Sequence, residues 1–155
     1  MQSDPIGLDG GENSFVYVGD NPLGRVDSKG LVDLNLFKPG DTIYYYAMQH
    51  GLFYPGYTVG AHGVPIVDQR DGGFRDITPF ELVEIMRKNG YNGGPVSLLV
   101  CNAGTSFNGE ASYAQILSRI LNTTVYAPTS NFYYGPLGIY STGDGKGLKA
   151  FFPWN

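Results

Sequence analysis

The spacing of apolar residues changes along the chain, and each change marks a predicted element. Short runs rich in β-branched and aromatic residues at 14–18, 42–48 and 57–61 predict strands. The sequence Thr78-Pro79-Phe80-Glu81 then predicts a helix start, because it places threonine at the N-cap, proline at the first helical position and glutamate at the third. Apolar residues at helical spacing follow, and Asn89-Gly90 supplies the stop signal.

The second half of the chain repeats this alternation. A continuous apolar run at 96–101 is typical of a strand covered on both faces, and the spacing over 113–121 predicts a second helix. Residues 123–127 are a further short strand candidate. This order predicts an α/β fold with a mostly parallel sheet flanked by helices. Two β-like runs, 138–141 and 148–152, are separated by a glycine-rich loop and predict a C-terminal β-hairpin.

Composition narrows the classes of function. The chain has 155 residues and a net charge of −4, and it contains no run of basic residues, so we expect no nucleic-acid partner. The longest apolar run is far short of the ~20 residues that cross a bilayer, and the N-terminus does not look like a signal peptide. The single cysteine excludes an intramolecular disulfide. No cluster with metal-ligand spacing is visible, so we predict neither a metal nor an organic cofactor.

Two chemically competent residues follow predicted strands. His62 comes directly after the run at 57–61, and Cys101 ends the run at 96–101, with one helix between them. Because parallel strands end at the same edge of a sheet, we expect the imidazole and the thiol to face each other there. A base beside a thiol raises the thiolate population, and the thiolate attacks a carbonyl. The backbone N–H groups of Gly63 and Cys101 are candidates to stabilise the oxyanion.

Neighbouring polar residues are candidates for supporting roles. Asp68 and Asp76 follow His62 and are candidates to orient its ring or to bind a basic group of a substrate, and Asn102 follows the candidate nucleophile. His50 is also followed by glycine, but bulky residues precede it and no clear strand–helix–strand step follows it, so it is the weaker candidate base. An inert buried thiol and a solvated acidic loop stay open as structural alternatives.

The two strand ends together resemble the caspase-like cysteine peptidases. The matching segments are Val59-Gly60-Ala61-His62-Gly63 and residues 96–104, in the expected order. The resemblance spans roughly residues 40–127 and implies a caspase-like fold without a cofactor. It also implies that His62 is the general base and Cys101 the nucleophile. The glutamine-alanine-cysteine signature of true caspases is absent.

Residues 4–31 carry a second, independent resemblance. Asp4-Pro5-Ile6-Gly7-Leu8 and the downstream Gly30-Leu31 are similar to the terminal segment of the core domain in rearrangement-hotspot (Rhs) repeat proteins. In that family the segment closes a β-cage and precedes a variable toxin tip. The resemblance implies that residues 1–31 are a remnant of the Rhs core and that residues 32–155 are the toxin domain. The chain departs from the family at Ser28, where proline is usual.

The same resemblance suggests where the chain is processed. Aspartates in the Rhs segment are implicated in self-cleavage after its final leucine. The corresponding residues here are Asp4, Asp27 and Leu31.

Together the resemblances imply a toxin that is delivered into a target cell, as in interbacterial competition, without a signal peptide of its own. The expected activity is that of a Cys–His thiol hydrolase, a cysteine endopeptidase that cleaves a protein of the target cell. The implied partners are that protein substrate, a cognate immunity protein and the Rhs core cage. Two alternatives stay open: an ADP-ribosyltransferase-type toxin that uses NAD, and a non-catalytic binding tip.

Overall fold

A computed structural model describes residues 3–5, 8–12, 32–50 and 54–155. The chain divides into two compact units, Met1–Gly30 and Leu31–Asn155. In the first unit, β1 (Ser3–Pro5) pairs antiparallel with β2 (Leu8–Glu12). The strand predicted at 14–18 lies outside the described residues.

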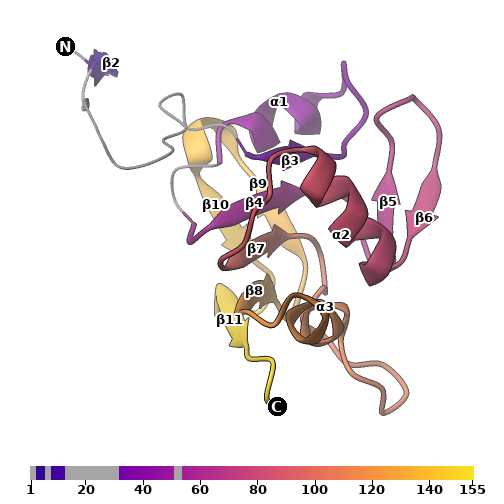
Figure 1. Ribbon diagram of the computed structural model, residues 1–155. Coiled ribbons are helices and arrows are strands. Elements are labelled where there is room, and N and C mark those ends of the chain that lie inside the picture. The colour runs from indigo at the N-terminus through magenta and orange to yellow at the C-terminus, as the bar shows by residue number, and fades with distance from the viewer. Residues whose placement is uncertain (1–2, 6–7, 13–31, 51–53) are drawn as a thin grey trace. The chain divides into compact units, whose positions relative to one another are not determined.

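A five-stranded sheet with the order β11-β8-β7-β4-β3 organises the second unit (Figure 1). Four neighbouring strands are parallel, and the edge strand β11 runs antiparallel to β8. The prediction of an α/β fold with a mostly parallel sheet is therefore confirmed. The strands are β3 (Leu34–Asn35), β4 (Tyr57–Gly60), β7 (Val96–Leu99), β8 (Val125–Pro128) and β11 (Leu148–Phe151).

Two predicted helices cover one face of this sheet, on the near side in Figure 1. The helix α2 (Pro79–Lys88) begins with the predicted capping box of Thr78 and Glu81. The helix α3 (Tyr113–Leu121) is capped by the hydroxyl of Ser112. Buried residues of both helices pack with every second residue of the strands and form the main core, which includes Leu82, Met86, Leu117, Val59, Leu98 and Val125.

The other face of the sheet is covered by α1 (Thr42–Met48) and by a hairpin of β9 (Phe132–Tyr134) and β10 (Tyr140–Thr142). A Cβ at Gly60, on β4, would lie 3.2 Å from the Tyr134 hydroxyl and 3.5 Å from the Ala47 Cβ. Both contacts place α1 and β9 directly over this strand.

The strand predicted at 42–48 was wrong, because these residues form the helix α1. Its three consecutive tyrosines favour strands, but such a preference is weak beside tertiary packing. The buried positions Ala47 and His50 lie three residues apart, with half-buried Ile43 one turn before them. This helical spacing buries one side of the segment against the sheet and leaves Tyr45 exposed.

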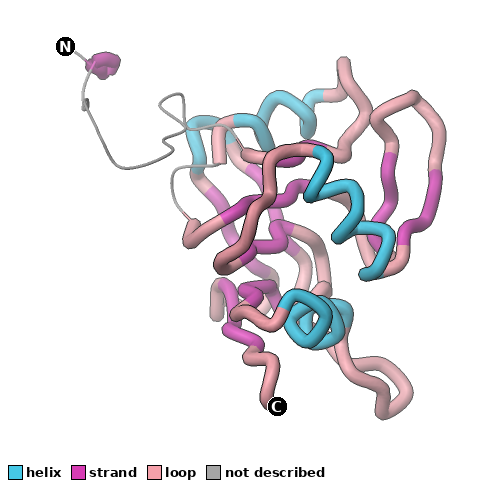
Figure 2. The backbone as a smooth tube through the Cα atoms, viewed as in Figure 1, coloured by secondary structure: helices cyan, strands magenta, loops and turns pink. Residues whose placement is uncertain are grey.

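The predicted C-terminal hairpin was also wrong in its pairing. Strands do form in both runs, but β10 pairs with β9 and β11 pairs with β8. Alternation of apolar and polar residues predicts where strands lie but not which strands pair. Here the turn at 143–147 joins strands of two different sheets. The strands β5 (Ile66–Asp68) and β6 (Arg75–Ile77) form a further hairpin that was not predicted. It follows β4 and precedes α2 in the chain (Figure 2).

Candidate functional site

His62 and Cys101 leave the sheet from adjacent parallel strands. The register of β4 and β7 places Gly60 opposite Leu99, and each candidate residue follows two positions later. The two side chains therefore start from the same edge of the sheet, as the sequence predicted.

The side chains also start from the same face. Side chains alternate between the two faces of a strand, and Ala61 and Val100 belong to the main core beneath α2 and α3. The residues that follow them, His62 and Cys101, lie on the opposite face, where Cys101 bonds to Phe132 of β9 and His62 contacts Phe37. Side chains on opposite faces of the sheet could not have acted together. The observed placement of His62 and Cys101 on one face is compatible with catalysis.

Gly63 packs against the end of the cysteine strand. A Cβ at this position would lie 2.3 Å from Cγ1 of Val100 and 3.7 Å from the carbonyl oxygen of Cys101. Only glycine allows so close an approach of the two segments. In the described part of the chain, the N–H groups of Gly63 and Cys101 donate to no backbone carbonyl. Both therefore remain candidates for an oxyanion site.

The backbone of β9 holds the Cys101 sulfur. The N–H of Phe132 donates to Sγ at 3.3 Å, and the thiol lies 3.6 Å from the carbonyl oxygen of the same residue. The Tyr134 hydroxyl, two residues along β9, donates to the carbonyl oxygen of Leu99. Among the described residues, the hydrogen bonds of the sulfur go to Phe132 and not to His62. In the described part of the chain, no hydrogen bond therefore joins the two candidate residues.

The His62 side chain is exposed and rests against Phe37. The two rings meet edge to face at 4.7 Å, and Phe37 meets Tyr134 in the same way at 5.3 Å. Partial burial lowers the pKa of His62, and the charge of Asp41 opposes this shift. The lowered pKa favours the neutral imidazole, the form that accepts a proton from a thiol. Phe37 and Asp41 carry no sequence signal that would have assigned them to this site.

Neither of the candidate aspartates after His62 is among the charges that shift the pKa of its ring. Asp68 is buried at the end of β5 and forms ion pairs with Arg70 at 2.9 Å and Arg75 at 3.1 Å. Burial alone would raise the pKa of Asp68, but the hydrogen bonds and charges of the arginines lower it. Asp76 is exposed on β6. Asp68 thus braces the β5–β6 hairpin, and Asp41 is the carboxylate that acts on His62.

Asn102 fixes the turn that follows Cys101. Its N–H donates to the carbonyl oxygen of Ser130 at 2.9 Å, and its Nδ2 donates to Oδ1 of Asn131 at 3.2 Å. The Thr105 hydroxyl donates to Oδ1 of Asn102 at 3.3 Å. Asn102 has a φ of +58°, a conformation that asparagine tolerates better than most residues. Asn102 therefore positions the cysteine loop against the segment that leads into β9.

Comparison with known proteins places the chain in a family. A model described as a domain of unknown function (DUF8616) matches residues 32–146. The chain belongs to the DUF8616 family. The putative uncharacterized protein YibJ of Escherichia coli strain K12 is 38% identical over 116 residues, which cover 72% of this chain and 48% of YibJ. The chain therefore spans about half the length of this curated relative. No solved structure matches the chain.

The other histidine of the DUF8616 domain, His50, is a buried structural residue. Its side chain is fully buried, and its Nε2 lies 3.1 Å from the carbonyl oxygen of Gly135. A carbonyl oxygen only accepts, so Nε2 carries the proton, and Nδ1 accepts from the Tyr54 hydroxyl at 3.2 Å. Both ring nitrogens are engaged, which leaves His62 as the available base.

We expect His50 to make the stability of the domain sensitive to acid. Burial lowers the pKa of His50, opposed in part by the hydrogen bond to Gly135, whereas an unfolded histidine titrates near a pH of about 6.5. The unfolded chain therefore binds the proton first, so this contribution is complete above pH ~6.5 and is lost as the pH falls through that value. Urea unfolding between pH 7.5 and pH 5.5, on the order of one pH unit either side of that value, measures the loss. His50→Gln should flatten this slope more than His62→Gln, and equal slopes in wild type and His50→Gln would refute the assignment.

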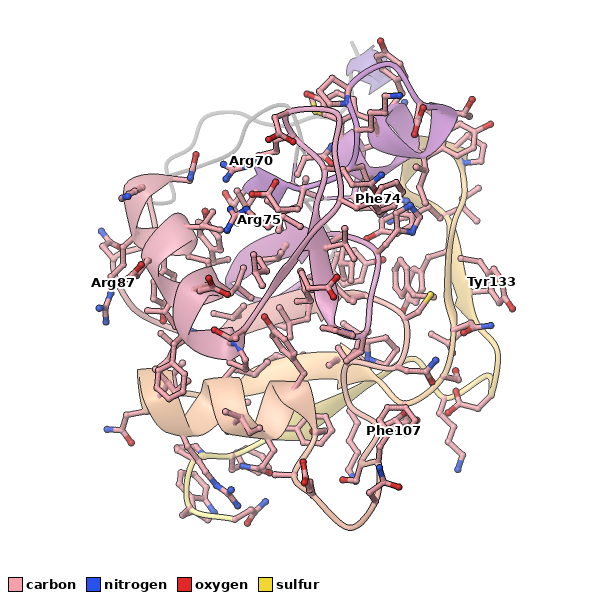
Figure 3. The ribbon with its side chains drawn as sticks, turned by 90° about the vertical axis from the view of Figure 1, so that its right-hand side faces the viewer. Arg70, Phe74, Arg75, Arg87, Phe107 and Tyr133 are labelled. Carbon is pink, nitrogen blue, oxygen red and sulfur yellow. The ribbon has the colours of Figure 1, made fainter. Side chains whose placement is uncertain are left out.

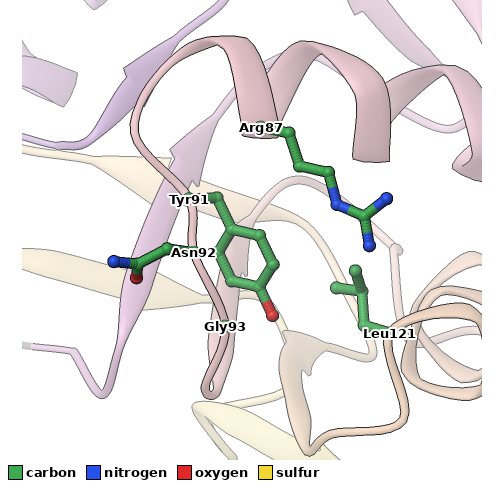
Figure 4. Close-up of a pocket in the computed structure, with 5 residues that line it drawn as sticks. All are labelled: Arg87, Tyr91, Asn92, Gly93 and Leu121. Atoms are coloured by element: carbon green, nitrogen blue, oxygen red, sulfur yellow. The ribbon is translucent and has the colours of Figure 1, made fainter.

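A pocket of about 430 Å³ lies at the opposite edge of the sheet (Figure 4). Two of its lining residues lie at the C-terminal ends of α2 and α3 and the other three lie in the loop between α2 and β7, so the pocket is at the amino ends of β7 and β8. Ligands of open α/β sheets bind beyond the carboxyl ends, and we assign this pocket no catalytic role. The lining residues are Arg87, Tyr91, Asn92, Gly93 and Leu121.

The remaining candidates concern processing, metal binding and the membrane. Asp4 lies in β1, and Asp27 and Leu31 lie outside the described residues. In the part of the chain that the structure describes, no group of three or more histidine, cysteine or acidic residues is placed to hold a metal ion. No helix in that part has the length and apolarity needed to cross a bilayer.

Proposed function

We propose that this chain is a toxin of Rhs type whose second unit is a Cys–His thiol hydrolase, a caspase-like cysteine endopeptidase that cleaves a protein of the target cell. One observation carries the proposal. His62 and Cys101 lie two residues beyond the ends of adjacent parallel strands, at one edge of the sheet, and Gly63 packs against Val100, which precedes the cysteine. A neutral imidazole beside a half-buried thiol is the minimum apparatus for nucleophilic catalysis.

The proposed reaction proceeds in two steps. His62 takes the thiol proton of Cys101, the sulfur bonds to the peptide carbonyl carbon, and the negative charge on oxygen is held by the N–H groups of Gly63 and Cys101. The carbon–nitrogen bond then breaks, and the amine leaves with the proton from His62. In the second step His62 takes a proton from water, the hydroxide adds to the thioester carbon, and the carbon–sulfur bond breaks. The acid product leaves and the thiol regains its proton.

The order of elements supports the caspase-like part of the proposal. The strand β4, with His62 and Gly63 just beyond its end, is followed by a small hairpin, a helix, and the neighbouring parallel strand β7, with Cys101 just beyond its end. Catalytic hydrogen bonds often form only when a substrate is bound.

The delivery part of the proposal rests on residues 4–31 and their resemblance to the Rhs core. It implies that the core cage carries the second unit until release, with cleavage after Leu31 as the separating step. A toxin aimed at bacteria would also need an immunity protein in the producing cell. The proposed site of action is inside the target cell.

Alkylation of the single cysteine tests the pairing directly. We expect iodoacetamide to modify Cys101 about tenfold more slowly at pH 6.5 in His62→Gln than in wild type, because the imidazole no longer accepts the thiol proton. Mass spectrometry of the intact full chain gives the rate, since the chain has one cysteine. His50→Gln is the matched control, because His50 has both ring nitrogens engaged. Equal rates in wild type and His62→Gln would remove the basis of the proposal.

A further inference from the structure

Three exposed aromatic side chains stand on the loops around the proposed site. Phe74 is 80% exposed, Phe107 is 55% exposed and Tyr133 is 53% exposed. Phe74 lies in the turn of the β5–β6 hairpin that follows His62, Phe107 in the loop that follows Cys101, and Tyr133 on β9. Figure 3 shows the three on separate segments, with Tyr133 at the right-hand margin of the view. We call these residues the aromatic rim.

Hydrogen bonds connect Tyr133 to the turn after the candidate nucleophile. Nδ2 of Asn131 donates to the Tyr133 hydroxyl at 3.2 Å, and Nδ2 of Asn102 donates to Oδ1 of Asn131 at 3.2 Å. On β9 the neighbouring Phe132 faces inward, 4% exposed, with its N–H on the sulfur, so alternation turns Tyr133 outward. One short strand therefore holds the thiol through the backbone of Phe132 and presents the ring of the next residue, Tyr133, to solvent.

The charges around the rim favour a polypeptide over a polyanion. Asp71, Asp76 and Glu110 are exposed in the same loops. The two arginines there, Arg70 and Arg75, are both paired with a single buried carboxylate. Nucleic acids and anionic membranes require clusters of unpaired cations. Exposed aromatic rings amid carboxylates suit apolar side chains of a neutral or basic polypeptide.

We propose that the aromatic rim is a substrate-binding surface that selects an extended peptide segment with bulky apolar side chains near the bond that faces Cys101. This inference rests on the proposed function. An extended chain advances about 3.3 Å per residue, so a segment of several residues reaches from one loop to the next. Aromatic residues contribute most when an apolar side chain covers them and excludes water. The rim thus binds such a segment and presents its backbone to the thiol.

Two matched electrophilic peptides test the rim in the full chain. Acetyl-Phe-Leu-Phe chloromethyl ketone and acetyl-Ala-Ala-Ala chloromethyl ketone share a reactive group and differ in side-chain size. We expect the first to alkylate Cys101 about tenfold faster, the discrimination typical of an apolar subsite. The variant with Phe74→Ser, Phe107→Ser and Tyr133→Ser together should reduce this ratio to about one. The rate with iodoacetamide, which has no side chain, corrects for any change in thiol reactivity.

Trp154→Ser is the matched control for loss of an exposed aromatic residue. Trp154 is 77% exposed and follows β11, whose end pairs with the amino end of β8, away from the site. This variant should keep the wild-type ratio. Equal alkylation rates for both peptides in wild type, or an unchanged ratio in the triple variant, would contradict the proposal that the aromatic rim binds substrate. A ratio that depends on the rim but not on His62 would retain the binding surface and reject the proposed Cys–His chemistry.

Discussion

Replacing Cys101 with alanine is expected to abolish the toxicity of the chain while leaving its fold intact. The sulfur would be the only nucleophile of the proposed reaction, and losing such a group typically costs at least ~10³-fold in rate. The structural loss is small, because the thiol is half-buried at the edge of a small apolar cluster and its hydrogen bonds are two weak ones to Phe132. Colony counts of bacteria that produce the full chain measure toxicity, and circular dichroism with thermal unfolding measures the fold.

Cys101→Ser separates chemistry from packing. Serine keeps the size and the hydrogen-bonding capacity of the side chain but is a far weaker nucleophile, so this variant should also be inactive. Full toxicity of a folded Cys101→Ala chain would end the hydrolase proposal. If toxicity persists and cellular NAD falls in the same cultures, the ADP-ribosyltransferase alternative gains support. If toxicity persists without NAD loss, a binding toxin becomes the better explanation.

The parts of the site that sequence could predict are those encoded by local pattern. The apolar runs and the capping box place His62 and Cys101 at the ends of parallel strands that flank one helix. The register of β4 and β7 then brings the two residues to one edge and one face. Period-2 alternation indicates a face within each strand, whereas the register that aligns the two strands is a property of their pairing.

The parts that could not be predicted come from segments far along the chain. Phe132 and Tyr134 bond to Cys101 and Leu99 because β9 forms a hairpin with β10. Nothing in the sequence of either strand predicts this pairing. The residue types of α1 favour a strand, because three of its seven residues are tyrosines. The segment is nevertheless a helix, because packing buries one of its sides against the sheet. The role of His50 depends on that helix, because His50 lies two residues beyond its end and bonds to Gly135 from there. Non-local contacts, not local propensity, decide each of these features.

Gly63→Ala should damage both stability and catalysis, and Val100→Ala should repair part of the first. The added Cβ would lie 2.3 Å from Cγ1 of Val100, a stiff β-branched side chain at the end of the cysteine strand. Overpacking of this kind typically costs about 1–3 kcal/mol in the free energy of unfolding. The strain would also move the Gly63 N–H from its proposed place in the oxyanion site, and loss of one such donor slows catalysis by about 10²–10³-fold.

A double-mutant cycle distinguishes this specific clash from general disruption. Val100→Ala removes the clashing methyl group, so the double variant should be less destabilised than the sum of the two single variants, by at least about 1 kcal/mol. Urea unfolding of wild type, both single variants and the double variant gives this coupling. Additive effects would show that Gly63 does not sense Val100. Catalysis should recover less than stability does, because relief of the clash need not restore the direction of the Gly63 N–H. Full recovery of both would instead assign Gly63 a packing role alone and leave Cys101 as the one donor to the oxyanion.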